Sequence, residues 1–135
     1  MTGGAVEPAG RTILLVEDES ATRLTLATVL RTEGYTVLEA ADGPAAEALL
    51  AKVRVEPALL LTDFVMPGMN GHQLAERVRA RFPKVKVLIM SAHIEEADVQ
   101  KDVLDETFRA GALFLQKPFE PDALLRRVRA ILATP

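Results

Sequence analysis

Short apolar runs alternate with longer amphipathic stretches along nearly the whole chain. The runs occupy residues 13–16, 35–38, 58–61, 85–90 and 112–115. At least three of them are almost continuously apolar, which is typical of strands that are covered on both faces. The stretches between the runs carry apolar residues at helical spacing, as do Leu124, Val128, Ile131 and Leu132 near the end. The pattern predicts a strand followed by a helix, repeated five times.

Residues that favour helix boundaries agree with this division. Pro44 and Pro121 stand where a first helical turn would begin, a position that needs no backbone N–H. Gly34 and Gly111 follow predicted helices, as glycines that end helices do. Since repeated strand–helix units form parallel sheets with helices on both faces, we predict a doubly wound α/β fold. It would have a five-stranded parallel sheet and five helices.

Length and composition limit the class of protein. With 135 residues, of which 49% are hydrophobic and 26% charged, the chain can bury the core of one ordinary domain. We expect residues 1–11, which are rich in Gly and Ala, to be a flexible lead-in, and residues 12–135 to form the domain. The absence of cysteine excludes disulfide bonds and thiolate metal sites.

The charge and the termini favour a cytoplasmic protein that binds neither nucleic acid nor membranes. A formal net charge of −3 argues against a general binder of nucleic acid or anionic lipid. No apolar run approaches the roughly 20 residues that cross a bilayer. The N-terminus lacks the basic start and apolar core of a signal peptide. Because the chain ends at Pro135, just after the last apolar stripe, we also expect no attached output domain.

Polar and charged residues directly follow four of the predicted strands. Glu17 and Asp18 follow the first strand, Asp63 the third, Ser91 the fourth and Lys117 the fifth. Alone, each has an ordinary explanation: an acidic helix start, a turn cap, a loop hydroxyl or a surface amine. In open parallel sheets, however, binding sites form beyond the carboxyl ends of the strands. The joint placement of these residues therefore predicts a site at that edge.

The residue types at this edge point to phosphoryl chemistry. Carboxylates that meet there repel one another and raise one another's pKa unless a cation lies between them. Oxygen ligands of this kind suit Mg²⁺, which neutralises phosphate charge. Lys117 offers a mobile positive charge and Ser91 a hydroxyl donor to a phosphoryl oxygen. Asp63 is then the natural nucleophile, since a carboxylate can form an aspartyl phosphate.

Four segments together resemble the receiver domain of response regulators in two-component signalling systems. They are residues 16–19, 61–71, 90–92 and 114–119. The most specific part combines Asp-x-x-Met-Pro-Gly-Met-Asn-Gly at 63–71 with Lys-Pro-Phe at 117–119. The resemblance extends from residue 12 to residue 132 and implies a flavodoxin-like receiver fold.

The resemblance also implies a phosphoryl acceptor and a metal site. Asp63 would accept a phosphoryl group from a phosphohistidine. Asp18 and Asp63 would bind Mg²⁺ directly, together with the backbone carbonyl of Val65. Glu17 would act through a metal-bound water.

Three further roles follow from the same resemblance. Ser91 and Phe114 would be switch residues that move when the acceptor is phosphorylated, and Lys117 would contact the phosphoryl group. The Lys117–Pro118 peptide is usually cis in this family. Glu17, Phe114 and Ser91 depart from the commoner Asp, Tyr and Thr, and none of these changes removes the chemistry.

The function implied is that of a phosphorylation-controlled switch, not of an enzyme acting on external substrates. Its partners would be a sensor histidine kinase or a histidine phosphotransfer protein. It would signal to a downstream protein, or to a second copy, through the face of the fourth and fifth helices. A stand-alone regulator and the receiver of a hybrid histidine kinase are both open.

Two other functions compete with this interpretation. The first is a Mg²⁺-dependent phosphohydrolase that uses Asp63 on external substrates. Phosphatases of the haloacid dehalogenase type need a second Asp two residues further on, where this chain has Val65. The second is an adaptor that works without phosphate, which the intact set of acidic, hydroxyl and amine residues disfavours.

Overall fold

The computed structural model describes residues 11–91 and 111–133, and within them five strands and four helices. The strands are β1 (Thr12–Val16), β2 (Thr36–Ala40), β3 (Leu59–Asp63), β4 (Lys86–Ser91) and β5 (Leu113–Gln116). The helices are α1 (Ser20–Thr32), α2 (Gly43–Lys52), α3 (Gly71–Arg81) and α5 (Pro121–Ala133). Every predicted strand is therefore present. The predicted fourth helix falls between Ser91 and Gly111, outside the described residues.

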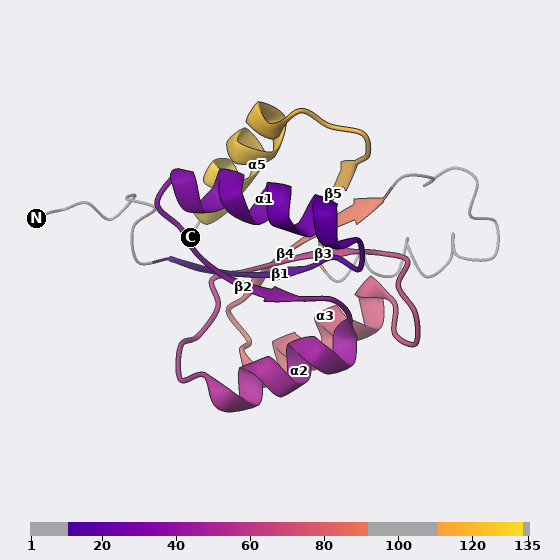
Figure 1. Cartoon of the computed structure of the whole chain (residues 1–135). Coiled ribbons are helices and arrows are strands. Elements are labelled where there is room, and N and C mark those ends of the chain that lie inside the picture. Colours follow the sequence, from indigo (N-terminus) through magenta and orange to yellow (C-terminus); the bar gives the residue numbers. More distant parts are fainter. Residues whose placement is uncertain (1–10, 92–110, 134–135) are drawn as a thin grey trace, which may run out of the picture.

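The strands form one parallel sheet in the order β2-β1-β3-β4-β5. Helices α1 and α5 cover one face of the sheet, and α2 and α3 cover the other (Figure 1). The strand order reverses direction after β2, since β1 lies between β2 and β3. This arrangement confirms the predicted doubly wound α/β fold and brings the carboxyl ends of β1 and β3 side by side.

The two central strands are buried on both faces. All five residues of β1 and of β3 are buried. In β1, Leu14 belongs to the core on the α2–α3 side, whereas Ile13 and Leu15 belong to the core on the α1–α5 side. Leu60 and Leu61 of β3 divide in the same way. Burial on both faces explains why these segments are continuously apolar in the sequence.

β3 continues through two polar residues beyond the predicted run. The apolar pattern ended at Leu61, yet the strand includes Thr62 and Asp63, both buried. Thr62 is paired with Ile89 and Asp63 with Met90 of β4. The backbone ladder with β4 thus extends the strand although the side chains become polar. Asp63 is consequently fixed by the sheet and is not a loop residue.

The helix boundaries follow the expected local chemistry. The carboxylate of Asp42 accepts a hydrogen bond of 2.8 Å from a first-turn amide of α2, and Pro44 lies in the same turn. Asn70 and Gln73 form a reciprocal capping box at the start of α3. Gly34, after α1, has a φ of 107°, a conformation that favours glycine.

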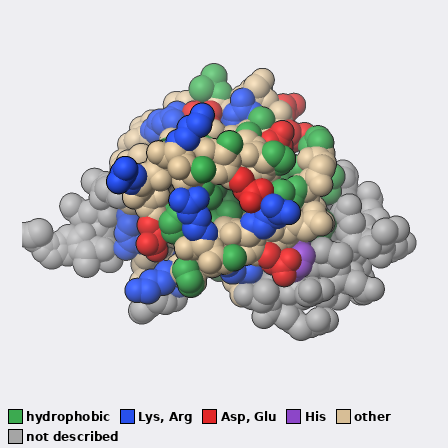
Figure 2. Space-filling model, turned by 90° about the horizontal axis from the view of Figure 1, so that it is seen from below, with side chains coloured by type: hydrophobic (Ala, Val, Ile, Leu, Met, Phe, Trp, Pro, Cys, Tyr) green, Lys and Arg blue, Asp and Glu red, His purple; other side chains and the backbone are tan. Residues whose placement is uncertain are grey.

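The outer face of α2 and α3 carries charges of both signs. Figure 2 shows Lys and Arg side chains interspersed with Asp and Glu on this face. Arg77 of α3 pairs with Glu47 of α2 at 3.1 Å. Interspersed charge is typical of a solvated helix surface. None of the helices in the described part of the chain has the length and apolar character needed to cross a membrane.

Gly71 lets α3 begin directly against the end of β3. A Cβ atom at this position would lie 2.6 Å from the carbonyl oxygen of Asp63 and 3.1 Å from the Cα atom of Phe64. Both obstacles are backbone atoms, which cannot move without distorting the strand. We therefore expect Gly71→Ala to lower the free energy of unfolding by about 2–3 kcal/mol, measured by urea denaturation.

Gly43 provides a matched control, because it also begins a helix and is buried. A Cβ atom there would lie 2.6 Å from Sδ of Met69, the flexible part of a side chain. We expect Gly43→Ala to cost about 1 kcal/mol or less. Equal losses of unfolding free energy in the two variants would contradict the claim that the β3 backbone makes Gly71→Ala more destabilising.

Candidate functional site

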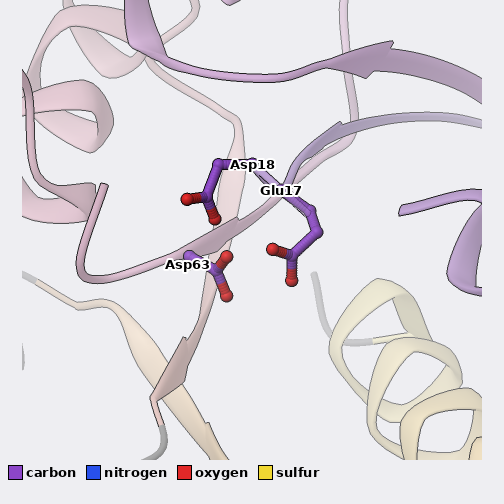
Figure 3. A group of neighbouring side chains, drawn as sticks. All are labelled: Glu17, Asp18 and Asp63. Atoms are coloured by element: carbon purple, nitrogen blue, oxygen red, sulfur yellow. The ribbon is translucent and has the colours of Figure 1, made fainter. Parts of the chain in front are cut away.

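Three carboxylates meet at the carboxyl ends of β1 and β3. Glu17 and Asp18 follow β1 directly, and Asp63 is the last residue of β3. One oxygen atom of each lies within 4.8 Å of the others, and the three side chains converge (Figure 3). Glu17 and Asp63 are 2% and 5% exposed, whereas Asp18 is exposed. The site therefore has two buried carboxylates and one that is open to solvent.

Lys117 joins the two buried carboxylates. Its Nζ atom lies 2.6 Å from Oδ1 of Asp63 and 3.0 Å from Oε1 of Glu17. Its backbone amide donates to the carbonyl oxygen of Ser91 at 2.9 Å. The end of β4 therefore fixes the backbone position of Lys117. The Lys117–Pro118 peptide is cis, as the family resemblance implied.

Glu17 is held through its backbone and its side chain. Its amide donates to the carbonyl oxygen of Ala40 at 3.1 Å, and its own carbonyl oxygen accepts from Nη1 of Arg23 at 2.8 Å. Its Oε2 atom accepts from the amide of Glu19 at 3.1 Å. The contact with Arg23 was not foreseen from the sequence. The available signal was a cation near the N-terminus of a helix, where the helix dipole disfavours positive charge.

Burial and the neighbouring charges shift the pKa values of this group. Burial raises the pKa of Asp63 to about 7, and the adjacent Glu17 adds to the rise while Lys117 opposes it. Burial also acts to raise the pKa of Glu17, but hydrogen bonds with Asp63, the Glu19 amide and Lys117 hold it below its ordinary value. Burial acts to lower the pKa of Lys117, and the two carboxylates outweigh it, so that this pKa is raised.

The donor set fits a hard divalent cation. Three carboxylates against one ammonium leave a formal charge of −2 when all groups are ionised. Carboxylate oxygens are the ligands that Mg²⁺ prefers, and Mg²⁺ commonly binds through one or two of them while it retains water. The open side chain of Asp18 leaves one flank of the cluster accessible to such a hydrated ion.

The other predicted site residues lie in β4, in β5 and in the segment after β3. Ser91 ends β4 and is 8% exposed, and Phe114 in β5 is half-buried against the core on the α2–α3 side. Val65, two residues after Asp63, is 63% exposed. The switch roles of Ser91 and Phe114, and the role of the Val65 carbonyl as a ligand, stay predictions.

A family model and two similar proteins point to the same protein family. A family model described as the response regulator receiver domain matches residues 13–129. Sensor kinase CckA of Brucella abortus (strain 2308) is 36% identical over 121 residues, which make up 90% of this chain and 12% of that protein. Sporulation initiation phosphotransferase F of Bacillus subtilis (strain 168) is 34% identical over 121 residues, or 89% of this chain and 92% of that protein.

Comparison with solved structures also finds a receiver domain. A crystal structure of the receiver domain from the hybrid histidine kinase CckA superposes with a TM-score of 0.73 at 34% identity, covering 90% of this chain and 98% of that one. The chain thus spans about an eighth of one curated relative and nearly the full length of another.

The raised pKa of Asp63 makes the stability of the metal-free protein depend on pH. A neutral Asp63 favours the folded state below the ordinary pKa of 3.8, and this contribution is lost as the pH rises through about 7. With EDTA present, we expect the free energy of unfolding to fall by about 2 kcal/mol between pH 5 and pH 8. The lowered pKa of Glu17 acts in the opposite direction, but mainly below its ordinary value of 4.5.

Asp63→Asn removes the titrating group and is the control for this measurement. Its stability is expected to change little over the same pH range, and to exceed that of the metal-free wild type at pH 8. A wild-type stability that rises from pH 5 to pH 8 would contradict the shifted pKa.

Proposed function

The chain belongs to the response regulator receiver domain family of two-component signalling, and on that basis we propose that it is a switch driven by phosphorylation of Asp63. The observation that carries the proposal is the contact of this buried carboxylate with Lys117, at 2.6 Å, beside two further acidic side chains. A buried ion pair needs only the one cation, whereas a phosphoryl acceptor needs both a cation and metal ligands close by.

The reaction proposed is a transfer from phosphohistidine to carboxylate. An ionised oxygen of Asp63 attacks phosphorus, the new O–P bond forms as the P–N bond breaks, and the electron pair of the broken bond stays on the imidazole nitrogen. Asp63 must be ionised to attack, and the ammonium of Lys117 favours that form. The protein contributes mainly position and charge neutralisation.

We propose the metal ligands from this cluster and, for Val65, from the family resemblance. Asp18, Asp63 and the backbone carbonyl of Val65 would hold Mg²⁺ directly, and Glu17 would act through a bound water. The ion would supply positive charge to the phosphoryl oxygens. Lys117, which already contacts the acceptor, would supply a second positive charge.

The signal would leave the site through Ser91 and Phe114. Ser91 ends the strand next to β5 and its carbonyl binds the Lys117 amide, so a movement of one residue affects the other. Phe114 lies in β5 against the core, and α5 contacts its carbonyl through Arg127 at 2.9 Å. The output face proposed for a downstream protein or a second copy is that of the fourth and fifth helices.

We propose a sensor histidine kinase or a histidine phosphotransfer protein as phosphodonor, and the cytoplasm as the location. The relatives include a sensor kinase and a sporulation phosphotransferase, so both a free regulator and part of a longer kinase are consistent with them. A phosphohydrolase acting on external substrates is not favoured, because Val65 offers no general acid two residues after Asp63.

The acceptor is tested with a small phosphodonor. Incubation with Mg²⁺ and phosphoramidate is expected to add one acid-stable, hydroxylamine-labile phosphate to the wild type. Asp63→Asn is expected to gain none, while Asp122→Asn, at an exposed position in the first turn of α5, is expected to react like the wild type. Labelling of Asp63→Asn at the wild-type level, or no labelling of the wild type, would exclude Asp63 as the acceptor.

Metal binding is tested by thermal unfolding. Mg²⁺ relieves repulsion among the carboxylates, so the thermal midpoint is expected to rise with the Mg²⁺ concentration. At ten times the dissociation constant, bound Mg²⁺ adds about 1.4 kcal/mol to the free energy of unfolding. Asp18→Asn is expected to lose most of this rise while Asp42→Asn, outside the cluster, keeps it. A rise of the same size for Asp18→Asn would remove Asp18 from the ligand set.

A further inference from the structure

Arg23 links α1 to the acidic loop and to β2. Its Nη1 atom donates to the backbone carbonyl oxygen of Glu17 at 2.8 Å, and its Nε atom lies 3.6 Å from Oε1 of Glu39 in β2. The side chain is only 22% exposed, and Glu39 is 28% exposed. One guanidinium therefore joins three segments that are separate in the sequence.

The carbonyl that Arg23 binds belongs to the peptide between the two adjacent acidic residues. The plane of this peptide contains the carbonyl of Glu17 and the amide of Asp18. The preceding peptide, between Val16 and Glu17, is also fixed, because the amide of Glu17 donates to the carbonyl oxygen of Ala40 at 3.1 Å. The two peptides that meet at Glu17 are thus both anchored, and this restricts where the backbone carries Asp18. A free carbonyl would let this peptide rotate and would move Asp18 relative to Asp63.

The surroundings of Arg23 are not explained by helix stability alone. The residue lies in the fourth position of α1, where the helix dipole repels a cation. Glu39 compensates, and it is itself anchored by Nη1 of Arg31 at 2.8 Å. Arg31 in turn donates to the carbonyl oxygen of Val37 at 2.9 Å. The guanidinium of Arg23 is thus supported from β2 while it contacts the loop that carries the acidic pair.

We propose that Arg23 is a positioning residue for the acidic pair: through the Glu17 carbonyl, it orients Asp18 for metal binding. The proposal rests on the function proposed above, since it concerns the same site. Groups that orient metal ligands commonly affect metal affinity by 10- to 100-fold when they are removed. Arg23 would act in this way although it contacts no carboxylate of the cluster.

The charge of Arg23 and its positioning role predict opposite effects of its removal on Mg²⁺ affinity, which makes the proposal testable. Removing a cation near the site reduces repulsion of Mg²⁺, so on charge alone Arg23→Met would bind Mg²⁺ more tightly. If Arg23 positions Asp18, the same variant binds Mg²⁺ more weakly. The methionine side chain preserves most of the apolar stem and leaves out the donors. The direction of the change therefore separates the two explanations.

The experiment measures the Mg²⁺ dissociation constant by calorimetry for wild type, Arg23→Met and Arg129→Met. Arg129 is the matched control, because it also pairs with a residue next to α1, Glu33 at 2.8 Å, and its loss removes the same charge away from the site. We expect Arg23→Met to weaken Mg²⁺ binding about tenfold and Arg129→Met to stay within about twofold of wild type. Binding by Arg23→Met that equals or exceeds that of the wild type overturns the proposal.

A second measurement needs no metal. The ¹⁵N heteronuclear NOE of the Asp18 amide reports the mobility of the peptide that Arg23 holds. We expect it to fall in metal-free Arg23→Met and not in Arg129→Met, and an unchanged value overturns the proposal. If the wild type itself binds no Mg²⁺, the proposed function fails, and this measurement still decides whether Arg23 fixes the peptide.

A milder variant covers the case in which Arg23→Met does not fold. Arg23→Lys keeps the charge but has one nitrogen to serve both the Glu17 carbonyl and Glu39. We expect it to bind Mg²⁺ about threefold more weakly than the wild type, since one of the two contacts is lost. An affinity equal to that of the wild type overturns the proposal.

Discussion

The ion pair between Lys117 and the two buried carboxylates is the contact on which the site depends. Asp63 and Glu17 are almost completely shielded from water, and a buried carboxylate without a partner is strongly unfavourable. One ammonium, at 2.6 and 3.0 Å, serves both. Once Asp63 is ionised, this single positive charge cannot balance the two negative ones, and a third carboxylate lies beside them. The ionised site therefore keeps an excess of negative charge, which a further cation would neutralise.

The parallel sheet makes this arrangement possible. The carboxylates follow β1 and β3, which are neighbours, and Lys117 follows β5 at the edge of the sheet. The ladder between β3 and β4 extends as far as Asp63, and the amide of Lys117 is bound by the last residue of β4. Backbone hydrogen bonds thus bring each charged side chain to the same edge. The side chains then only have to span the short remaining distance to one another.

Much of this could be predicted from the sequence, because the relevant signals are local. Buried strands are visible as continuous apolar runs, and parallel strands place whatever follows them at one edge. The convergence of Asp18, Asp63 and Lys117 followed from those two facts. The extension of β3 to Asp63 did not, since it depends on pairing with Met90, far away in the sequence. The contact of Arg23 with a backbone carbonyl was missed for a related reason: a cation near the start of a helix marks the arginine as unusual, but the carbonyl that it binds has no sequence signature.

The central claim is that Asp18 and Asp63 share one divalent ion next to Lys117. The most direct test is a crystal structure of the protein with Mn²⁺ in place of Mg²⁺, in which anomalous scattering locates the ion. Our account predicts one strong peak within about 2.0–2.3 Å of a carboxylate oxygen of both Asp18 and Asp63. A peak at another place on the molecule, or carboxylates of residues 18 and 63 that bind separate ions, would contradict it.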